Sequence, residues 1–437
     1  MNVRALSGRE EILLRVPDDA DLFVSRYPAP AAPAADLVLE AVRRPFGAPP
    51  LREALASRRP GEVVVVVSDV TRPVPYRDFL TALLGEIASA GVPQNEVLIL
   101  IAAGMHRPST PAERREMFGP DIVDRCRIED HRAGDGPGLA AAPGRSASGA
   151  AIRLNRRFVE AGFRLVTGLV EPHFMAGFSG GRKSVCPGLS SLETIREFHG
   201  EKMLSDPRAA NAVLEGNPLH EESLSVARAA GVDFTLNIVV DRGRRLVRAF
   251  AGALEPAHEA ACAFVRTCAV RPVGRPADVV LTGSGGYPLD ATFYQCVKGF
   301  VSCLPAVREG GTVIAFGACS QGLGSPAYAG LLREYAGRVD DFLADIKRPG
   351  VFTVDQWELQ MQARALARVG AGGLHFLSDG LPEETMRILT LTGRAAARGR
   401  LGAAVQSALD AALGPGKTLA VFPEGPYCVP ESIPSGE

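Results

Sequence analysis

The stretch Val-Val-Val-Val-Val-Ser-Asp-Val-Thr-Arg-Pro-Val-Pro, residues 63–75, decides the fold class. Its first six residues are almost all β-branched, which is typical of a strand buried on both faces of a parallel sheet. Asp69, Thr71 and Arg72 follow at once, and ligands of open α/β sheets bind beyond such strand ends. The stretch predicts an α/β fold in which Arg72 could hold a carboxylate through two hydrogen bonds. The structural alternative is a loop ion pair between Arg72 and Asp69.

Two further strands are predicted to end in chemically useful residues. Residues 96–101 form an apolar run that leads into Ala-Ala-Gly-Met-His-Arg-Pro-Ser-Thr, residues 102–110, and so place His106 at a strand end. Residues 163–170 form another such run. A histidine beside a strand end that carries Asp69 and Arg72 indicates acid/base chemistry.

The third strand end opens Glu-Pro-His-Phe-Met-Ala-Gly-Phe-Ser-Gly-Gly-Arg-Lys-Ser-Val-Cys-Pro-Gly, residues 171–188, which continues to His199. Glycines allow the backbone to approach a ligand closely, and successive N–H groups in such a loop can hold an anion. Lys183 adds a point charge or an amine nucleophile. His173 and His199 can each carry a proton or bind a metal.

Three other interpretations of this segment are weaker. Residues 177–184 nearly match the phosphate loop of nucleotide hydrolases, but Arg182 stands where its last glycine belongs. Residues 177–181 also fit the nucleophile pattern G-x-S-x-G, although Ser179 does not directly follow a strand as that pattern requires. A purely structural turn has no need of His173 and Lys183 together.

A second α/β region is predicted after the Arg/Pro-rich residues 271–276. A strand at 278–282 ends in Gly-Ser-Gly-Gly-Tyr-Pro-Leu-Asp, residues 283–290, and the next helix carries Tyr-Gln-Cys-Val-Lys, residues 294–298. Gln295 and Lys298 share one face of that helix. We therefore expect an N-terminal domain at 1–270 and a C-terminal domain at 277–437, whose last strand could return to the first domain. The strand ends of both domains are expected to face a shared cleft.

Composition narrows the class of protein. The 437 residues have a net charge of −1, so no basic surface indicates nucleic acid or an anionic membrane. No apolar run is long enough to cross a membrane, and residues 1–10 do not resemble a signal peptide. The eight cysteines have no disulfide or zinc spacing, which favours a cytoplasmic location. Only five of the 48 basic residues Lys and Arg are lysines, so Lys183 and Lys298 stand out.

These residues by themselves favour a two-base isomerase or a metal-assisted lyase with an anionic substrate. Six motifs, however, occur in the order of one family. The motifs at 68–75, 104–110 and 173–188, with Gly-Gly-Tyr-Pro-Leu-Asp, Tyr-Gln-Cys-Val-Lys-Gly and Asp-Gln-Trp, resemble those of the nickel-pincer lactate racemase family. The resemblance covers about residues 60 to 380 and departs at Met105, Met175 and Glu171-Pro172, which leaves the substrate open.

The resemblance implies a cofactor and a set of site residues. The cofactor is a nickel-pincer nucleotide, pyridinium-3-thioamide-5-thiocarboxylic acid mononucleotide, joined to Lys183 and ligated at nickel by His199. His106 and His173 match the acid/base pair. The resemblance places substrate contacts at Arg72, Tyr294, Gln295 and Lys298, and cofactor contacts at Asp69, Gly177, Ser179, Gly180, Gly181 and Trp357.

The implied reaction is racemisation of a 2-hydroxy acid, with lactate as the default, through hydride transfer and a planar 2-keto acid. Another 2-hydroxy acid (malate, an aryl-lactate or a sugar acid) is the alternative within the same chemistry. A non-catalytic binder of the cofactor or of a nucleotide is the alternative of another class. Implied partners are cofactor-biosynthesis proteins of the host, and a homo-oligomer with a second copy of the chain is left open.

Overall fold

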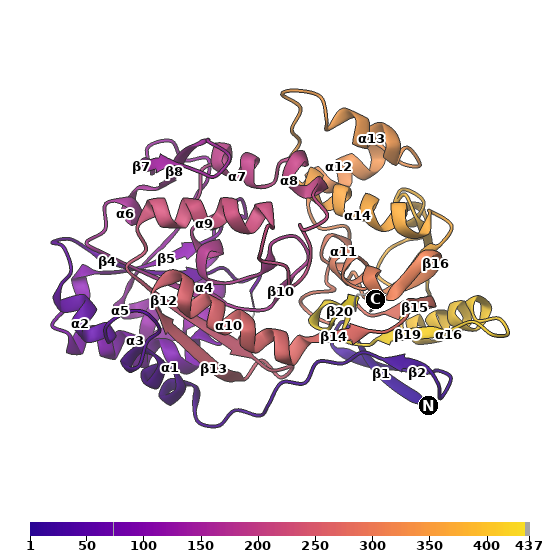
Figure 1. Ribbon diagram of the computed structural model, residues 1–437, viewed down its shortest axis with the longest axis horizontal. Helices are drawn as coiled ribbons and strands as arrows, with labels where there is room; N and C mark the ends of the chain where they lie inside the picture. Colours follow the sequence, from indigo (N-terminus) through magenta and orange to yellow (C-terminus); the bar gives the residue numbers. More distant parts are fainter. Residues whose placement is uncertain (73, 433–437) are drawn as a thin grey trace, which may run out of the picture. The chain divides into compact units, whose positions relative to one another are not determined.

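A computed structural model describes residues 1–72 and 74–432 (Figure 1). The chain forms two compact units. We call Tyr27–His199 with Arg208–Cys268 the N-terminal unit, and Met1–Arg26 with Gly200–Pro207 and the chain from Ala269 onward the C-terminal unit. Each unit holds a sheet with parallel strands and helices, so the expected α/β fold class is confirmed. Among the described residues, none of the helices combines the length and the apolar character needed to cross a membrane.

The sheet of the N-terminal unit has the strand order β13-β12-β9-β4-β5-β6, and its pairs are parallel except β12 with β13. Its strands are β4 (Val63–Ser68), β5 (Val97–Ala102), β6 (Arg127–Asp130), β9 (Phe163–Leu169), β12 (Phe234–Val240) and β13 (Leu246–Gly252). Two short pairs accompany it: β7 (Leu139–Arg145) with β8 (Ala151–Asn155), and β10 (Pro172–His173) with β11 (Gly177–Phe178).

The helices of this unit lie before, between and after the strands of its sheet along the chain. They are α1 (Ala34–Arg43), α2 (Leu51–Ala56), α3 (Tyr76–Ser89), α4 (Pro111–Phe118), α5 (Pro120–Arg125), α6 (Arg156–Val159), α7 (Leu192–Phe198), α9 (Pro218–Ala230) and α10 (Leu254–Ala269). Val63, Val65 and Val67 of β4 pack in one apolar cluster with α1, α2 and α3. Val64 and Val66 of the same strand are also fully buried, so both faces of the sheet are covered, as the β-branched run predicts.

Strand register brings the functional loops to one edge of this sheet. Ser68 at the end of β4 pairs with Ala102 at the end of β5, and Val66 pairs with Val166 of β9. Because the three neighbouring strands run in the same direction, the loops that follow them leave from the same edge. The segments that begin at Asp69 and Glu171 and the loop that contains His106 therefore start side by side.

The C-terminal unit has a second sheet of parallel pairs, in the order β18-β17-β16-β15-β19-β3. Its strands are β3 (Asp21–Leu22), β15 (Ala277–Thr282), β16 (Val307–Phe316), β17 (Leu374–Ser378), β18 (Thr392–Ala395) and β19 (Leu419–Phe422). Its helices are α8 (Glu201–Ser205), α11 (Phe293–Ser302), α12 (Pro326–Glu334), α13 (Val339–Asp345), α14 (Gln356–Val369), α15 (Glu383–Met386) and α16 (Leu401–Ala412).

The division of the chain differs from the expected domains 1–270 and 277–437. Residues 1–26 belong to the C-terminal unit, because β3 pairs in parallel with β19 and the hairpin β1 (Asn2–Ser7) with β2 (Glu10–Arg15) packs in its core. The last strand, β20 (Val429–Ser432), pairs with β14 (Val270–Val273) in the same unit. It does not return to the N-terminal unit, and β14 occupies much of the expected linker 271–276.

Candidate functional site

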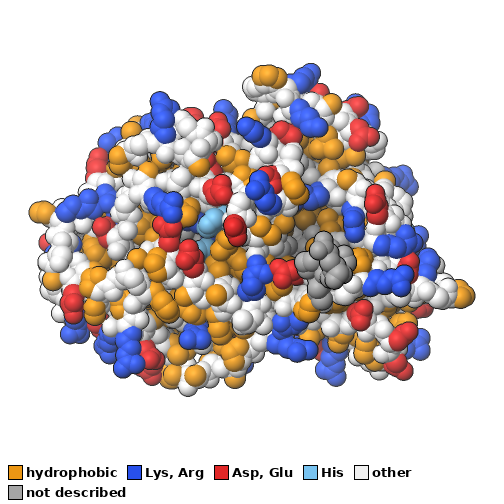
Figure 2. Space-filling view, in the orientation of Figure 1, with side chains coloured by type: hydrophobic (Ala, Val, Ile, Leu, Met, Phe, Trp, Pro, Cys, Tyr) orange, Lys and Arg blue, Asp and Glu red, His pale blue; other side chains and the backbone are white. Residues whose placement is uncertain are grey.

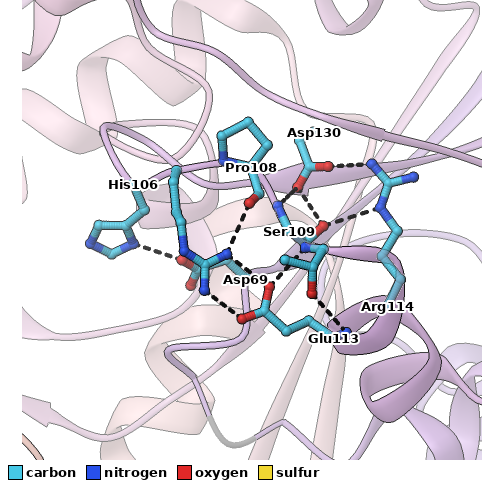
Figure 3. A network of polar contacts seen from close by, with 9 residues as sticks. Asp69, His106, Pro108, Ser109, Glu113, Arg114 and Asp130 are labelled. Atoms are coloured by element: carbon cyan, nitrogen blue, oxygen red, sulfur yellow. Dashed lines mark hydrogen bonds and ion pairs between the residues drawn. The ribbon is translucent and has the colours of Figure 1, made fainter. Parts of the chain in front are cut away.

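His106 is held by a carboxylate from the neighbouring strand end. Its backbone N–H donates to the carbonyl of Ala103 at 2.9 Å, which closes a turn after β5. Nδ1 of His106 lies 2.6 Å from Oδ2 of Asp69 (Figure 3). An ionised carboxylate only accepts hydrogen bonds, so Nδ1 carries the proton and Nε2 is the basic nitrogen. The His106 side chain is 53% exposed and that of Asp69 is 10% exposed, so the base is accessible and its support is buried.

Asp69 is ionised in spite of its burial. Burial alone would raise the pKa of this carboxyl, but hydrogen bonds from His106 and Thr71 and the charge of Arg72 outweigh it, and the pKa lies below its ordinary value. Oγ1 of Thr71 donates to Oδ1 at 2.7 Å. The observed contacts of Asp69 orient His106, while its expected contact with a cofactor stays a prediction.

The chain after His106 is fixed by the charged network of Figure 3. Arg107 forms two bonds to Glu113 at 2.5 and 2.8 Å, and Thr110 and Glu113 form a capping box at the start of α4. The bond from Arg107 is the main cause that lowers the pKa of Glu113 to about 2. Arg114 pairs with Asp130 at the end of β6. This network anchors the loop between β5 and α4 to the sheet.

Arg72 lies beside a carboxylate that the sequence did not single out as a partner. Nη1 of Arg72 is 3.6 Å from Oε1 of Glu171, and both side chains are partly buried, at 29% and 20% exposure. Its charge also lowers the pKa of Asp69. The structure therefore pairs Arg72 with Glu171, just after β9, and not with Asp69 as the structural alternative expected.

His173 and Lys183 face each other within the N-terminal unit. Nδ1 of His173 accepts from the backbone N–H groups of Met175 and Ala176, both at 3.3 Å, and Nε2 lies 2.8 Å from Nζ of Lys183. The tautomer of His173 sets which of the two side-chain nitrogens donates in this contact. The contact holds Lys183, whose amine form is a nucleophile, within hydrogen-bond reach of the imidazole.

Arg182 stabilises the loop that carries His173 and Lys183 through hydrogen bonds to its backbone. This residue is only 1% exposed, and its Nη2 donates to the carbonyls of Ala176 and Phe178 at 2.7 and 3.1 Å. Nη1 lies 2.9 Å from Nε2 of His258 on α10. Burial lowers the pKa of Arg182 to about 10, which still leaves it charged. The residue that breaks the phosphate-loop pattern thus holds the loop conformation.

The glycine-rich turn is also bound to the protein around it. The N–H of Ser179 donates to the carbonyl of Glu171 at 2.9 Å and its Oγ donates to that of Leu169 at 2.7 Å, while the N–H of Gly181 donates to Asn237 at 2.8 Å. Gly177, Gly180 and Gly181 have φ values of 76°, 75° and 49°, which residues other than glycine rarely adopt. Cofactor contacts stay a prediction for Gly177, Ser179, Gly180 and Gly181.

His199 is the C-cap residue that follows α7, and its ring packs edge-on against that of Phe198, with ring centroids 4.6 Å apart. Nζ of Lys183 lies 5.8 Å from the centre of the same Phe198 ring. Burial and the charge of Lys183 lower the pKa of His199 to about 3, so the imidazole is neutral, as a metal ligand must be. No cluster of three or more His, Cys, Asp or Glu side chains that could hold a metal occurs among the described residues.

The predicted residues of the C-terminal unit meet where α11 packs on α14. The indole N–H of Trp357 donates to the hydroxyl of Tyr294 at 2.9 Å, and that hydroxyl lies 3.3 Å from Oδ1 of Asp355. Nζ of Lys298 donates to Oε1 of Gln295 at 2.5 Å. The sequence predicted four of these residues by resemblance, and the structure joins them within one unit.

Two acidic residues in this group were missed as site candidates. Asp355 precedes α14 as its N-cap residue, with φ 67°, and accepts a hydrogen bond from Ser325. Glu358 is 1% exposed, and its Oε1 has no hydrogen-bond partner within the described part of the chain. Burial raises the pKa of Glu358 against the opposing charge of Lys298. Their positions in the sequence could have identified them, since Asp355 opens the Asp-Gln-Trp motif and Glu358 follows it directly.

Profiles of two protein domains match the chain. The lactate racemase N-terminal domain matches residues 7–212, and the lactate racemase C-terminal domain matches residues 273–426. Lactate racemase of Thermoanaerobacterium thermosaccharolyticum is 35% identical over 370 residues, which cover 84% of this chain and 86% of that protein. Lactate racemase of Lactiplantibacillus plantarum is 35% identical over 336 residues, 76% of this chain and 77% of that protein.

Solved structures agree. The lactate racemase apoprotein from Thermoanaerobacterium thermosaccharolyticum superposes with a TM-score of 0.88 at 31% identity, covering 99% of this chain and all of that one. A Thermotoga maritima protein superposes with a TM-score of 0.62 at 19% identity, covering 87% and 97% of the two chains, which supports the fold alone. By sequence over most of its length, the chain belongs to the lactate racemase family and is an isomerase.

Proposed function

We propose that the chain racemises a short 2-hydroxy acid, with lactate as the default substrate, through a planar 2-keto acid. The observation that carries this proposal is the pair of histidine centres on one edge of the N-terminal sheet. His106 is oriented by Asp69 and His173 is paired with Lys183. Two positioned imidazoles suit a reaction in which one takes the hydroxyl proton of a 2-hydroxy acid and the other returns a proton to that oxygen after the configuration at carbon has been inverted.

The residues present fit the nickel-pincer nucleotide as the cofactor. Lys183 faces His173 across a contact of 2.8 Å and offers the amine for the covalent link, and His199 offers a neutral imidazole to the metal. A cofactor that brings its own sulfur and carbon ligands needs few ligands from the protein. When bound, it supplies reversible acceptance of the substrate's α-hydride.

The proton steps fall to the two histidines. Nε2 of His106 takes the hydroxyl proton, because Nδ1 is already bonded to Asp69. The buried carboxylate also stabilises the imidazolium that forms. His173 is the acid/base group for the other enantiomer, with Lys183 engaged by the cofactor. Arg72 and Lys298 bind the substrate carboxylate, which holds the keto acid while its two faces exchange.

The direct test is chiral chromatography. Cofactor-loaded protein receives single enantiomers of lactate, malate, phenyllactate, 2-hydroxyglutarate and gluconate. Appearance of the opposite configuration from lactate is the expected result, and conversion of another acid alone would move the substrate within the same chemistry. No conversion of any acid by protein with bound nickel would contradict the proposed substrate class. Protein that binds the cofactor with no conversion of a wider range of acids would favour a binding role.

A further inference from the structure

Glu171 is rigidly placed beside the arginine expected to bind the substrate. Its backbone is held on both sides by Ser179, whose N–H donates to the Glu171 carbonyl at 2.9 Å and whose Oγ accepts from the Glu171 N–H at 3.0 Å. Its Oε1 lies 3.6 Å from Nη1 of Arg72. Glu171 also stands two residues before His173. A fixed negative charge therefore adjoins the carboxylate-binding group.

Of the three charged side chains Arg72, Glu171 and Asp69, only Arg72 can bind an added anion. Arg72 contributes one positive charge, while Glu171 and the ionised Asp69 contribute two negative charges. A guanidinium has five donors, so Arg72 can face Glu171 with one nitrogen and still receive a substrate carboxylate on another edge. A second carboxylate on the substrate has no such partner among these three side chains.

The short length of a diacid keeps its second carboxylate near Glu171 in any orientation of the substrate. In a 2-hydroxy diacid of four carbons, the second carboxylate lies within roughly 6 Å of the first, by standard covalent geometry. With the first carboxylate on Arg72, the second lies about one Debye length or less from Glu171 at 0.1 M salt. Because both side chains are partly buried, screening is weaker than at an open surface.

Building on the proposed function, we propose that Glu171 is a specificity-determining residue that makes the site select 2-hydroxy monocarboxylates and reject 2-hydroxy dicarboxylates. Its fixed carboxylate shares Arg72 with one substrate carboxylate and repels a second one. The property that is compared is the number of carboxylates on the substrate, so lactate with one and malate with two are the matched probes.

The test compares the wild-type chain with Glu171→Gln, which keeps the shape and removes the charge. With cofactor-loaded protein, the ratio of kcat/KM for malate to that for lactate should rise about tenfold or more. Titration calorimetry of the cofactor-free full chain should show the same change in the ratio of Kd values. Glu171→Asp should keep the wild-type preference. Glu160→Gln, which removes the exposed Arg156–Glu160 pair, should change nothing.

Salt gives a second measurement on the same two proteins. Raising the salt from 0.1 to 1 M should weaken the wild-type preference for lactate and leave that of Glu171→Gln unchanged. A ratio that changes less than twofold in the variant would overturn this inference while leaving racemisation in place. A wild-type chain that neither binds nor converts either acid would overturn both proposals.

Discussion

Nδ1 of His106 lies 2.6 Å from Oδ2 of Asp69, a carboxylate that is 37 residues earlier in the chain and at the end of the adjacent strand. The contact fixes the tautomer of His106 and leaves Nε2 free of the carboxylate. It also keeps Asp69 ionised within the protein. One hydrogen bond between two strand ends thus defines both the orientation and the basic atom of the proposed acid/base residue.

Asp69→Asn should lower kcat for racemisation by about 100-fold or more, with a smaller effect on KM. An amide cannot stabilise the imidazolium and can favour the wrong tautomer of His106. Steady-state kinetics with lactate measures the effect. Thr71→Val is the control, because it removes one of the bonds to Asp69 and leaves the carboxylate in place. Equal kcat values for Asp69→Asn and the wild type would contradict the orienting role.

His106→Ala and His173→Ala should each lower racemisation by about 100-fold or more, since positioned acid/base groups contribute factors of this size. In a single turnover, each variant should form the keto acid from only one enantiomer, and the two variants should prefer opposite enantiomers. Rapid-quench sampling measures both. His375→Gln in β17 is the control histidine change. Variants with unchanged turnover would exclude the two-histidine reaction.

Lys183→Arg should lose the covalent cofactor, because a guanidinium stays protonated and is not a nucleophile. Mass spectrometry of the intact chain should show the added mass of the nucleotide in the wild type and in the exposed control Lys347→Arg, but not in Lys183→Arg. A retained adduct in the variant would place the attachment elsewhere.

Glu358→Gln should make stability less dependent on pH. Burial raises the pKa of Glu358 to about 8, so between its ordinary value and pH 8 the folded chain holds a proton that the unfolded chain has lost. Stability therefore falls as pH rises through that window, and the loss is complete above pH 8. The variant should be more stable than the wild type at pH 9, and its advantage should shrink at pH 5.

Urea unfolding at pH 5, 7 and 9 measures this difference. The exposed Glu384→Gln should follow the wild type at all three values. A variant whose unfolding midpoint shows the pH dependence of the wild type would mean that Glu358 does not hold its proton in the folded chain.

The sequence determined the elements that depend on local pattern. The β-branched run 63–68 predicted β4, and the polar residues after 68 and 102 predicted functional strand ends. Both predictions were possible because the burial of a strand and the side chains that follow it depend on adjacent residues. The ordered motifs predicted the family and the α/β fold class. The hairpin of β12 and β13 is likewise local, since its two strands and its turn are contiguous in the chain.

Only the tertiary structure decided which of these residues meet. The partner of Arg72 is Glu171 because the register of β4 with β9 sets their loops side by side, and no local pattern encodes that register. Likewise, β3 is two residues long and carries no periodic signal, so its place beside β19 depends on a pairing across most of the chain. The sequence specified which chemical groups are present, and long-range packing determined the distances between them and their charge states.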